Sequence, residues 1–289
     1  MNTRVLRVPR LRGNHALAAY GISHDGSAFV VTDAIQNVPF DFAEYSKFKY
    51  GQQEAVHRYA GAIAAVAEPH LLAASEYDEP VVVTGTPYKR VPNAAQFLAI
   101  NSFRQLRKLG TCDVSYASIY QPRLAVGDYG KLSQAERDAR NRQKTRAFDP
   151  SDFEGKHVVL VDDVRITGSI ERSTVAMLAD IPTLSITCVN LVRLDPAVAL
   201  ERPTLENELN HSYVKNLHFL RSLMASQGGY AFTTRALKFV LEAPVTELLN
   251  LIATTPRPQL IELYQGIVEE GYDQMPAYKN SVGIIANVC

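Results

Sequence analysis

Near the start of the chain, apolar and polar positions alternate with the period of two that is typical of β-strands. The alternation covers residues 17–33 and is interrupted by the polar segment His-Asp-Gly-Ser at 24–27. An Asp-Gly pair between two alternating segments is a hairpin signal. We therefore predict that the chain opens with two antiparallel strands.

Segments with helical and strand periods then follow one another as far as residue 192. The patterns predict helices over residues 52–69, 94–109 and 170–179, and strands after Pro80 and over residues 114–119, 158–161 and 183–192. This βαβαβ order is typical of a mostly parallel sheet flanked by helices. The fold class is therefore predicted to be α/β.

The pattern changes beyond Asp195, where amphipathic helical segments follow without strands between them. These segments cover residues 205–226, 231–242, 244–253 and 257–270, and Gly or Pro residues separate them. We predict a helical carboxyl-terminal lobe. The expected division of the chain is an amino-terminal β hood at 1–50, an α/β core at 51–200 and the helical lobe at 201–289.

The composition is that of a globular chain without net charge. Of 289 residues, 46% are hydrophobic, which is enough for a sizeable core. Thirty basic residues balance thirty acidic ones, so bulk attraction to nucleic acid or to an anionic membrane is not expected. No apolar segment has signal-peptide or membrane-span length, and the three cysteines lack disulfide or metal-ligand spacing. We expect a cytoplasmic protein.

The strongest chemical signal follows the apolar segment 158–161. A continuous apolar run is typical of a strand buried on both faces, so Asp162 and Asp163 are expected at its carboxyl end, where open α/β sheets bind ligands. The Thr-Gly-Ser segment at 167–169 follows, at a strand-to-helix turn that favours anions. Because carboxylates suit sugar hydroxyls or hydrated Mg²⁺, the segment predicts a site for a Mg²⁺-bound sugar phosphate. The alternative is an acidic strand end before an ordinary helix cap.

Two segments carry a resemblance to a known family. The sequence VVLVDDVRITGS, residues 158–169, resembles the phosphoribosyl-pyrophosphate motif of the type I phosphoribosyltransferases. The sequence TGTPYKRVPNA, residues 84–94, is similar to the pyrophosphate loop of the orotate-type enzymes. Together with SKFKYG and DYGKLS, the first motif also resembles the subgroup found beside bacterial tellurium-resistance-type gene clusters. The resemblance implies the type I phosphoribosyltransferase fold for the α/β core, between the predicted hood and the predicted lobe.

By position, the resemblance implies a site for phosphoribosyl pyrophosphate. Asp162 and Asp163 would hold the ribose hydroxyls and Mg²⁺, the 167–169 turn would hold the 5-phosphate, and Lys89 and Arg90 would meet the pyrophosphate. The implied donor-binding residues are Tyr88, Lys89, Arg90, Asp162, Asp163, Val164, Arg165, Ile166, Thr167, Gly168 and Ser169. The residues given a catalytic role are Asp162, Asp163, Lys89 and Lys131. For Lys89 and Arg90, the alternative is a solvated basic turn.

Two positions depart from the family pattern. Ile166 stands where purine-using relatives often carry an Asp that handles the base proton, and an isoleucine cannot transfer a proton. Ile170 stands where many relatives place a hydroxyl. Glu171 is only a weak candidate for the missing base, so the two departures together weaken the case for purine salvage.

The acceptor site has fewer signals. Arg193 ends a predicted strand at a place that resembles the base-recognising segment of some purine relatives, and the alternative is a strand-end arginine that pairs with Asp195 or faces solvent. Lys47, Lys49 and Tyr50 precede the first long helix and could close over the donor. The alternative for these lysines is a solvated surface.

The segment 121–150 is polar, contains seven basic residues and is too long for an ordinary connection. We expect a lid that orders when the donor binds, excludes water and brings Lys131 to the pyrophosphate. The alternative is an exposed helical excursion without a catalytic role.

The predicted function is transfer of ribose 5-phosphate from phosphoribosyl pyrophosphate to an unidentified, base-like acceptor, with Mg²⁺ as cofactor and release of pyrophosphate. Its expected partners are the donor and a small-molecule acceptor, without nucleic acid or membrane, and the expected assembly is a homodimer. The lobe is expected to shape the acceptor pocket or an oligomer interface. The alternatives are a non-catalytic sensor of the donor, for which no helix-turn-helix or basic arm is found, and the reverse reaction on a nucleotide.

Overall fold

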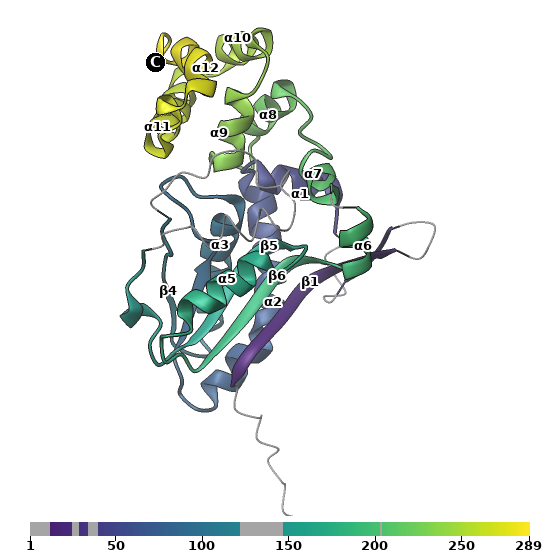
Figure 1. The fold of residues 1–289 in the computed structure, drawn as a ribbon, viewed down its shortest axis with the longest axis vertical. Helices are drawn as coiled ribbons and strands as arrows, with labels where there is room; N and C mark the ends of the chain where they lie inside the picture. The colour runs from purple at the N-terminus through teal and green to yellow at the C-terminus, as the bar shows by residue number, and fades with distance from the viewer. Residues whose placement is uncertain (1–11, 25–28, 34–39, 122–146, 203) are drawn as a thin grey trace, which may run out of the picture.

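The computed structural model describes residues 12–24, 29–33, 40–121, 147–202 and 204–289. A six-stranded sheet with the order β2-β1-β6-β5-β3-β4 lies at its centre (Figure 1). The strands are β1 (Gly13–His24), β2 (Phe29–Asp33), β3 (Val81–Gly85), β4 (Val114–Tyr116), β5 (His157–Arg165) and β6 (Ser185–Leu194). The β1–β2 pair is antiparallel and the other neighbouring strands are parallel, which confirms the predicted sheet and the predicted opening pair.

The opening pair extends the central sheet. β1 lies parallel to β6, with Ala18 opposite Asn190, and its far end pairs with β2. Residues 13–33 therefore contribute strands to the same sheet that carries the predicted site. The division of the chain into hood, core and lobe, with boundaries after residues 50 and 200, stays a prediction.

Three long helices cover the two faces of this sheet. They are α2 (Gln53–Ser75), α3 (Ala94–Leu109) and α5 (Ser169–Leu178). α2 and α3 lie on one face and α5 lies on the other (Figure 1). α2 is longer than the predicted helix and passes through Pro69. A proline removes one helical hydrogen bond, but the helix continues because Leu71 and Ala74 are buried in the core.

The apolar run in β5 is explained by burial on both faces. Val159 and Val161 belong to the hydrophobic cluster that includes residues of α2 and α3, whereas Val158 and Leu160 belong to the cluster that includes Leu178 of α5. Successive strand residues point to opposite faces. A strand covered on both faces therefore needs an apolar residue at every position, as predicted.

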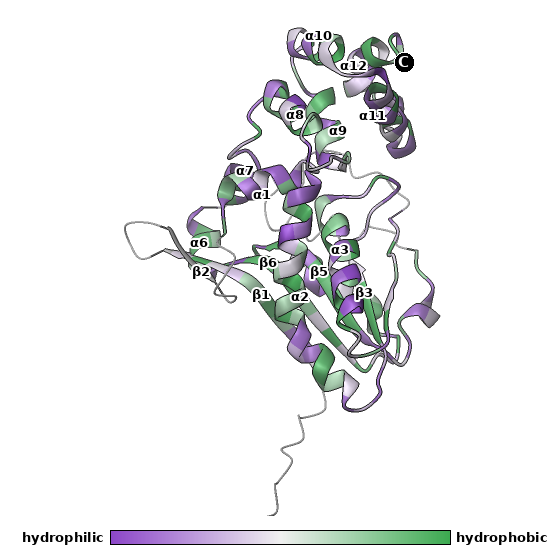
Figure 2. Cartoon of the chain, turned by 180° about the vertical axis from the view of Figure 1, so that it is seen from behind, coloured by the Kyte–Doolittle hydropathy of each residue, from purple (hydrophilic) through white to green (hydrophobic). Residues whose placement is uncertain are grey.

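The chain beyond β6 is helical, as predicted, but the predicted segment 205–226 forms two helices, and helices also form at 196–201 and 279–286, where none was predicted. The helices are α6 (Pro196–Glu201), α7 (Leu205–Asn210), α8 (Leu217–Met224), α9 (Thr234–Leu241), α10 (Val245–Thr254), α11 (Arg257–Glu270) and α12 (Lys279–Ala286), with short 3-10 helices at Tyr272–Gln274 and Pro276–Tyr278. Another 3-10 helix precedes β5, at Pro150–Asp152. In Figure 2 the strands are mainly hydrophobic, whereas the outer helix α11 shows long hydrophilic stretches.

Leu205 and Leu209 of α7 belong to the hydrophobic core around the sheet, whereas the predicted lobe has a hydrophobic core of its own from residue 214 onward. This core includes Tyr50, which follows α1 (Phe42–Lys49), and Val91, which follows β3. The lobe is thus packed against the two segments that approach the carboxyl end of the sheet. No helix in the described part of the chain is both long enough and apolar enough to cross a lipid bilayer.

Candidate functional site

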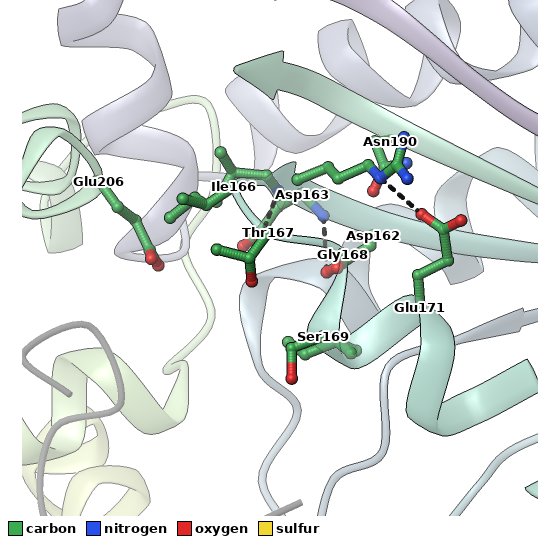
Figure 3. Close-up of a pocket in the computed structure, with 12 residues that line it drawn as sticks. Asp162, Asp163, Ile166, Thr167, Gly168, Ser169, Glu171, Asn190 and Glu206 are labelled. Atoms are coloured by element: carbon green, nitrogen blue, oxygen red, sulfur yellow. Dashed lines mark hydrogen bonds and ion pairs between the residues drawn. The ribbon is translucent and has the colours of Figure 1, made fainter. Parts of the chain in front are cut away.

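A pocket lies where the carboxyl ends of β5 and β6 meet the start of α5 and the helix α7 (Figure 3). Its space amounts to about 430 Å³, part of which is open solvent. The lining residues are Asp162, Asp163, Val164, Arg165, Ile166, Thr167, Gly168, Ser169, Ile170, Glu171, Asn190 and Glu206. Every predicted donor-binding residue from 162 to 169 therefore lines one pocket.

The two acids lie inside β5 rather than after it. The strand was predicted to end at residue 161, but its pairing with β6 continues as far as Arg165, and Asp162 lies opposite Asn190. The extension follows from the register with β6, a strand of 10 residues that supplies partners for these residues. Asp162 and Asp163 are 9% and 8% exposed, so both carboxyl groups are buried close to the pocket surface.

Each acid is held by the backbone of its own strand. Asp163 N donates to Asp162 Oδ1 at 2.9 Å, and Val164 N donates to Asp163 Oδ1 at 2.7 Å. Burial raises the pKa of Asp162 well above its ordinary value, and the negative charge of Asp163 adds to the shift. Ionisation of Asp162 beside the charge of Asp163 is therefore costly without a cationic partner.

Lys49, at the end of α1, provides such a partner through a buried ion pair with Asp163. Lysine is almost never buried unless it is paired, and Lys49 is 6% exposed. Of the three residues expected to close over the donor, Lys49 contacts a pocket residue. Lys47 pairs with Glu44 of its own helix at 3.5 Å, and Tyr50 packs into the core of the lobe.

The turn between β5 and α5 is compact and surrounded by cations. Gly168 has φ +69°, and a Cβ at this position would lie 3.2 Å from Arg165 Nε and 3.3 Å from Arg172 Nη1. Arg172, which was not predicted, donates to Thr167 O at 2.7 Å, and Arg165 pairs with Glu171 at 2.8 Å. A helix amino terminus beside two guanidinium groups suits a phosphate.

The predicted pyrophosphate loop contacts the lobe and does not line the pocket. Lys89 Nζ donates to Glu270 O at 2.8 Å, while Arg90 N and Val91 N donate to Glu270 Oε1 at 2.9 and 2.8 Å. Glu270 is 4% exposed and ends α11. A buried carboxylate of the lobe therefore holds this loop in place. A role for Tyr88, Lys89 and Arg90 in pyrophosphate binding stays a prediction.

Arg193 also lies outside the pocket lining. Arg193 is exposed on β6. Asp195, its suggested partner, accepts a hydrogen bond from Ala197 N at 2.8 Å and caps α6. Lys131 and most of the predicted lid, residues 122–146, fall outside the described residues. The acceptor role of Arg193 and the catalytic role of Lys131 stay predictions.

Two residues of the pocket lining were not predicted from the sequence. Asn190 is a polar residue within the apolar run of β6, and it lies opposite Asp162. Knowledge of the register between β5 and β6 would have allowed this position to be predicted. Glu206 lies on α7, outside the motif and far from it along the chain. No pattern in the sequence connects that helix with the pocket.

A family model described as PRTase ComF-like matches residues 24–285. The chain belongs to this family. The predicted phosphoribosyltransferase family is thereby confirmed, whereas the tellurium-resistance subgroup stays a prediction.

Solved structures similar to this ComF-like protein include two phosphoribosyl transferases. Hypoxanthine phosphoribosyl transferase of Trypanosoma cruzi is 16% identical, with a TM-score of 0.35, over 51% of this chain and 68% of that chain. Hypoxanthine-guanine phosphoribosyl transferase of L. donovani is 15% identical, with a TM-score of 0.36, over 53% and 79%. At this identity the likeness concerns the fold alone. No curated protein matches the chain.

Proposed function

We propose that this ComF-like protein transfers ribose 5-phosphate from phosphoribosyl pyrophosphate to an acceptor and releases pyrophosphate. The observation that carries the proposal is the meeting of Asp162, Asp163 and the 167–169 turn in one pocket. The donor has a diol at one side of its ribose and a phosphate at the other. The pocket has carboxylate acceptors for the diol and N–H donors for the phosphate.

The phosphate end of the site rests on the start of α5. Backbone N–H groups of the turn would hold the 5-phosphate, and Arg165 and Arg172 would add positive charge around it. The close approach of phosphate to backbone is possible because Gly168 has no side chain. The absence of a hydroxyl at Ile170 removes one donor, but the backbone donors are independent of it.

The carboxylates fit Mg²⁺ that arrives with the donor. Among the described residues, no group of three or more His, Cys, Asp or Glu side chains is arranged to hold a metal ion. Magnesium commonly takes one or two carboxylates together with substrate phosphates. Asp162 and Asp163 would therefore hold the ion jointly with the donor, and the ion would supply charge neutralisation for the pyrophosphate.

The reaction needs no protein nucleophile. The bond between ribose C1 and a pyrophosphate oxygen breaks, and its electron pair leaves with the pyrophosphate. The acceptor donates an electron pair to C1, and an acceptor that reacts through an N–H group releases that proton to solvent. The positive charge that develops on the ribose is stabilised by positioning and by nearby negative charge. Lys89, Arg90 and Lys131 remain the candidates for contact with the leaving group.

Release of pyrophosphate tests this function. The protein is incubated with phosphoribosyl pyrophosphate, Mg²⁺ and a panel of bases. We expect acceptor-dependent release that is lost when Asp162 and Asp163 are both changed to Asn. Asp180→Asn, at an exposed position outside the pocket, is the matched control. Donor binding without release would favour the non-catalytic sensor, and a lack of donor binding would refute the proposal.

A further inference from the structure

The predicted pyrophosphate loop, residues 86–93, leaves β3 beside the acidic pair of β5. Gly85, the last residue of β3, lies opposite Val161 in the parallel register. The loop therefore begins next to Asp162 and Asp163. Parallel strands place their carboxyl ends at one edge of the sheet, where open α/β sheets bind ligands. A ligand that fills the pocket and extends from β5 toward β3 would meet this loop.

The second half of the loop is embedded in the helical lobe. Val91 is 7% exposed and belongs to the hydrophobic core of the lobe. The helix α11 passes close to it, since a Cβ at Gly266 would lie 3.5 Å from Val91 Cγ2. In addition, Thr234 N at the start of α9 donates to Pro92 O at 3.3 Å. The course of the loop is thus set by the lobe as well as by the sheet.

Glu270 provides the polar part of this anchor. Its Oε1 accepts hydrogen bonds from Arg90 N at 2.9 Å and from Val91 N at 2.8 Å. Glutamate is almost never buried unless it is paired, and Glu270 is 4% exposed. Hydrogen bonds to an ionised carboxylate are stronger than those between neutral groups. Two successive N–H groups on one oxygen therefore fix the orientation of the backbone at residues 90 and 91.

The side chain of Lys89 is held at the same place. Lys89 Nζ donates to Glu270 O at 2.8 Å. Glu270 is the last residue of α11, where carbonyl groups lack helical partners and the helix dipole favours a cation. Lysine has three N–H donors, so this bond uses one of the three. Two backbone N–H groups and one ammonium group of the loop thus depend on a single residue of the lobe.

We propose that Glu270 is a positioning residue for the donor, because it holds residues 89–91 in the arrangement that receives the pyrophosphate. The inference rests on the proposed function, since it assigns the loop to the leaving group of the donor. Glu270 acts through the loop and does not contact the donor. A loop that is ordered before its ligand arrives binds that ligand more tightly than one that is ordered on binding.

A carboxylate on two N–H groups also resembles a bound anion, so Glu270 could instead block an anion site of the loop. The burial of Glu270 and Val91 favours the positioning role. The N–H groups of Arg90 and Val91 point to a carboxylate inside the lobe, where the donor does not reach them. The two roles predict opposite changes in donor affinity when the carboxylate is removed.

Calorimetry with two ligands that differ only in the pyrophosphate on ribose C1 tests the inference. Phosphoribosyl pyrophosphate and ribose 5-phosphate are titrated separately into the full chain, with Mg²⁺ and without an acceptor. Both ligands need the acidic pair and the 167–169 turn, whereas only the donor reaches the loop. The wild type should bind the donor at least about tenfold more tightly than ribose 5-phosphate, because the pyrophosphate adds charge-assisted hydrogen bonds.

Variants at residue 270 separate positioning from a general effect on the fold. Glu270→Ala should weaken donor binding about tenfold and leave the affinity for ribose 5-phosphate unchanged. Glu270→Gln keeps an acceptor oxygen for both N–H groups and should restore most of the donor affinity. Glu270→Asp, whose carboxylate is one methylene shorter in reach, should fall between them, and it gives the same test if Glu270→Ala does not fold. Glu269→Ala and Glu269→Gln are the matched controls, because Glu269 is exposed on the same helix.

The proposed function and the inference fail in different ways. If the wild type does not bind phosphoribosyl pyrophosphate, the proposed function is refuted and the inference with it. If it binds, the inference alone is overturned by any of three results. These are wild-type or higher donor affinity in Glu270→Ala, an equal loss of affinity for both ligands, or a wild type that binds the donor no more tightly than ribose 5-phosphate.

Discussion

Replacement of Lys49 by methionine tests the buried ion pair that joins α1 to the acidic strand. Lys49→Met keeps the apolar stem of the side chain but removes the charge beside Asp163, and the two side chains are only 8% and 12% exposed. Loss of one partner from a buried pair costs about 3–5 kcal/mol. We expect the lower limit, about 3 kcal/mol, because Asp163 keeps its hydrogen bond from Val164 N at 2.7 Å.

Urea denaturation followed by circular dichroism measures this loss. A decrease of about 3 kcal/mol corresponds to an unfolding equilibrium about 100-fold less favourable to the native state. The double variant Lys49→Met with Asp163→Asn should recover part of the loss, because no uncompensated charge remains. Lys47→Met is the control, since its partly exposed pair with Glu44 should contribute about 0.5 kcal/mol. A loss below about 1 kcal/mol for Lys49→Met, or a double variant no more stable than the single one, would refute the reasoning.

Three further substitutions test other parts of the site. The raised pKa of Asp162 means that the native state binds more protons than the unfolded state above the ordinary aspartate pKa of about 4. The free energy of unfolding should therefore fall as the pH rises, until Asp162 ionises in the native state. Asp162→Asn should flatten this dependence on pH and stabilise the protein at neutral pH. If urea denaturation at several pH values gives the same dependence for the variant and the wild type, this reasoning is wrong. Glu270→Ala leaves two backbone N–H groups of the loop unpaired, so the free energy of unfolding should decrease by about 2 kcal/mol. Trypsin should then cleave faster after Arg90, whereas the exposed control Glu269→Ala should behave like the wild type. Gly168 has a φ of +69°, which an alanine side chain disfavours, so Gly168→Ala should weaken binding of the donor about tenfold. Unchanged affinity in calorimetry would exclude a role for this turn in donor binding.

The centre of the site could be predicted because it lies within one continuous segment. The strand, the turn and the helix start at 158–169 are local structures, and burial on both faces leaves an apolar run that is visible in the sequence. The continuation of β5 to Arg165 could not be predicted in the same way. It depends on the register with β6, which the sequence of β5 alone does not contain.

The contributions of distant segments could not be predicted from local patterns. Lys49, Glu206 and Glu270 reach the site or its loops because α1, α7 and α11 pack on the carboxyl end of the sheet. The amphipathic pattern predicts each helix, but it does not say which neighbour the helix meets. Glu270 departs from the amphipathic pattern, in which charged residues face solvent. It is buried, and its carboxylate accepts hydrogen bonds from two backbone N–H groups.

Calorimetric titration of phosphoribosyl pyrophosphate in the presence of Mg²⁺ tests the central claim most directly. Wild-type protein and the Asp180→Asn control should bind the donor with the same affinity. The variant with Asn at both 162 and 163 should bind it at least about 100-fold more weakly, because hydrogen bonds from the ribose diol to two carboxylates are lost. Its circular dichroism spectrum should match that of the wild type. Wild-type affinity for the donor in this folded double variant would contradict the account.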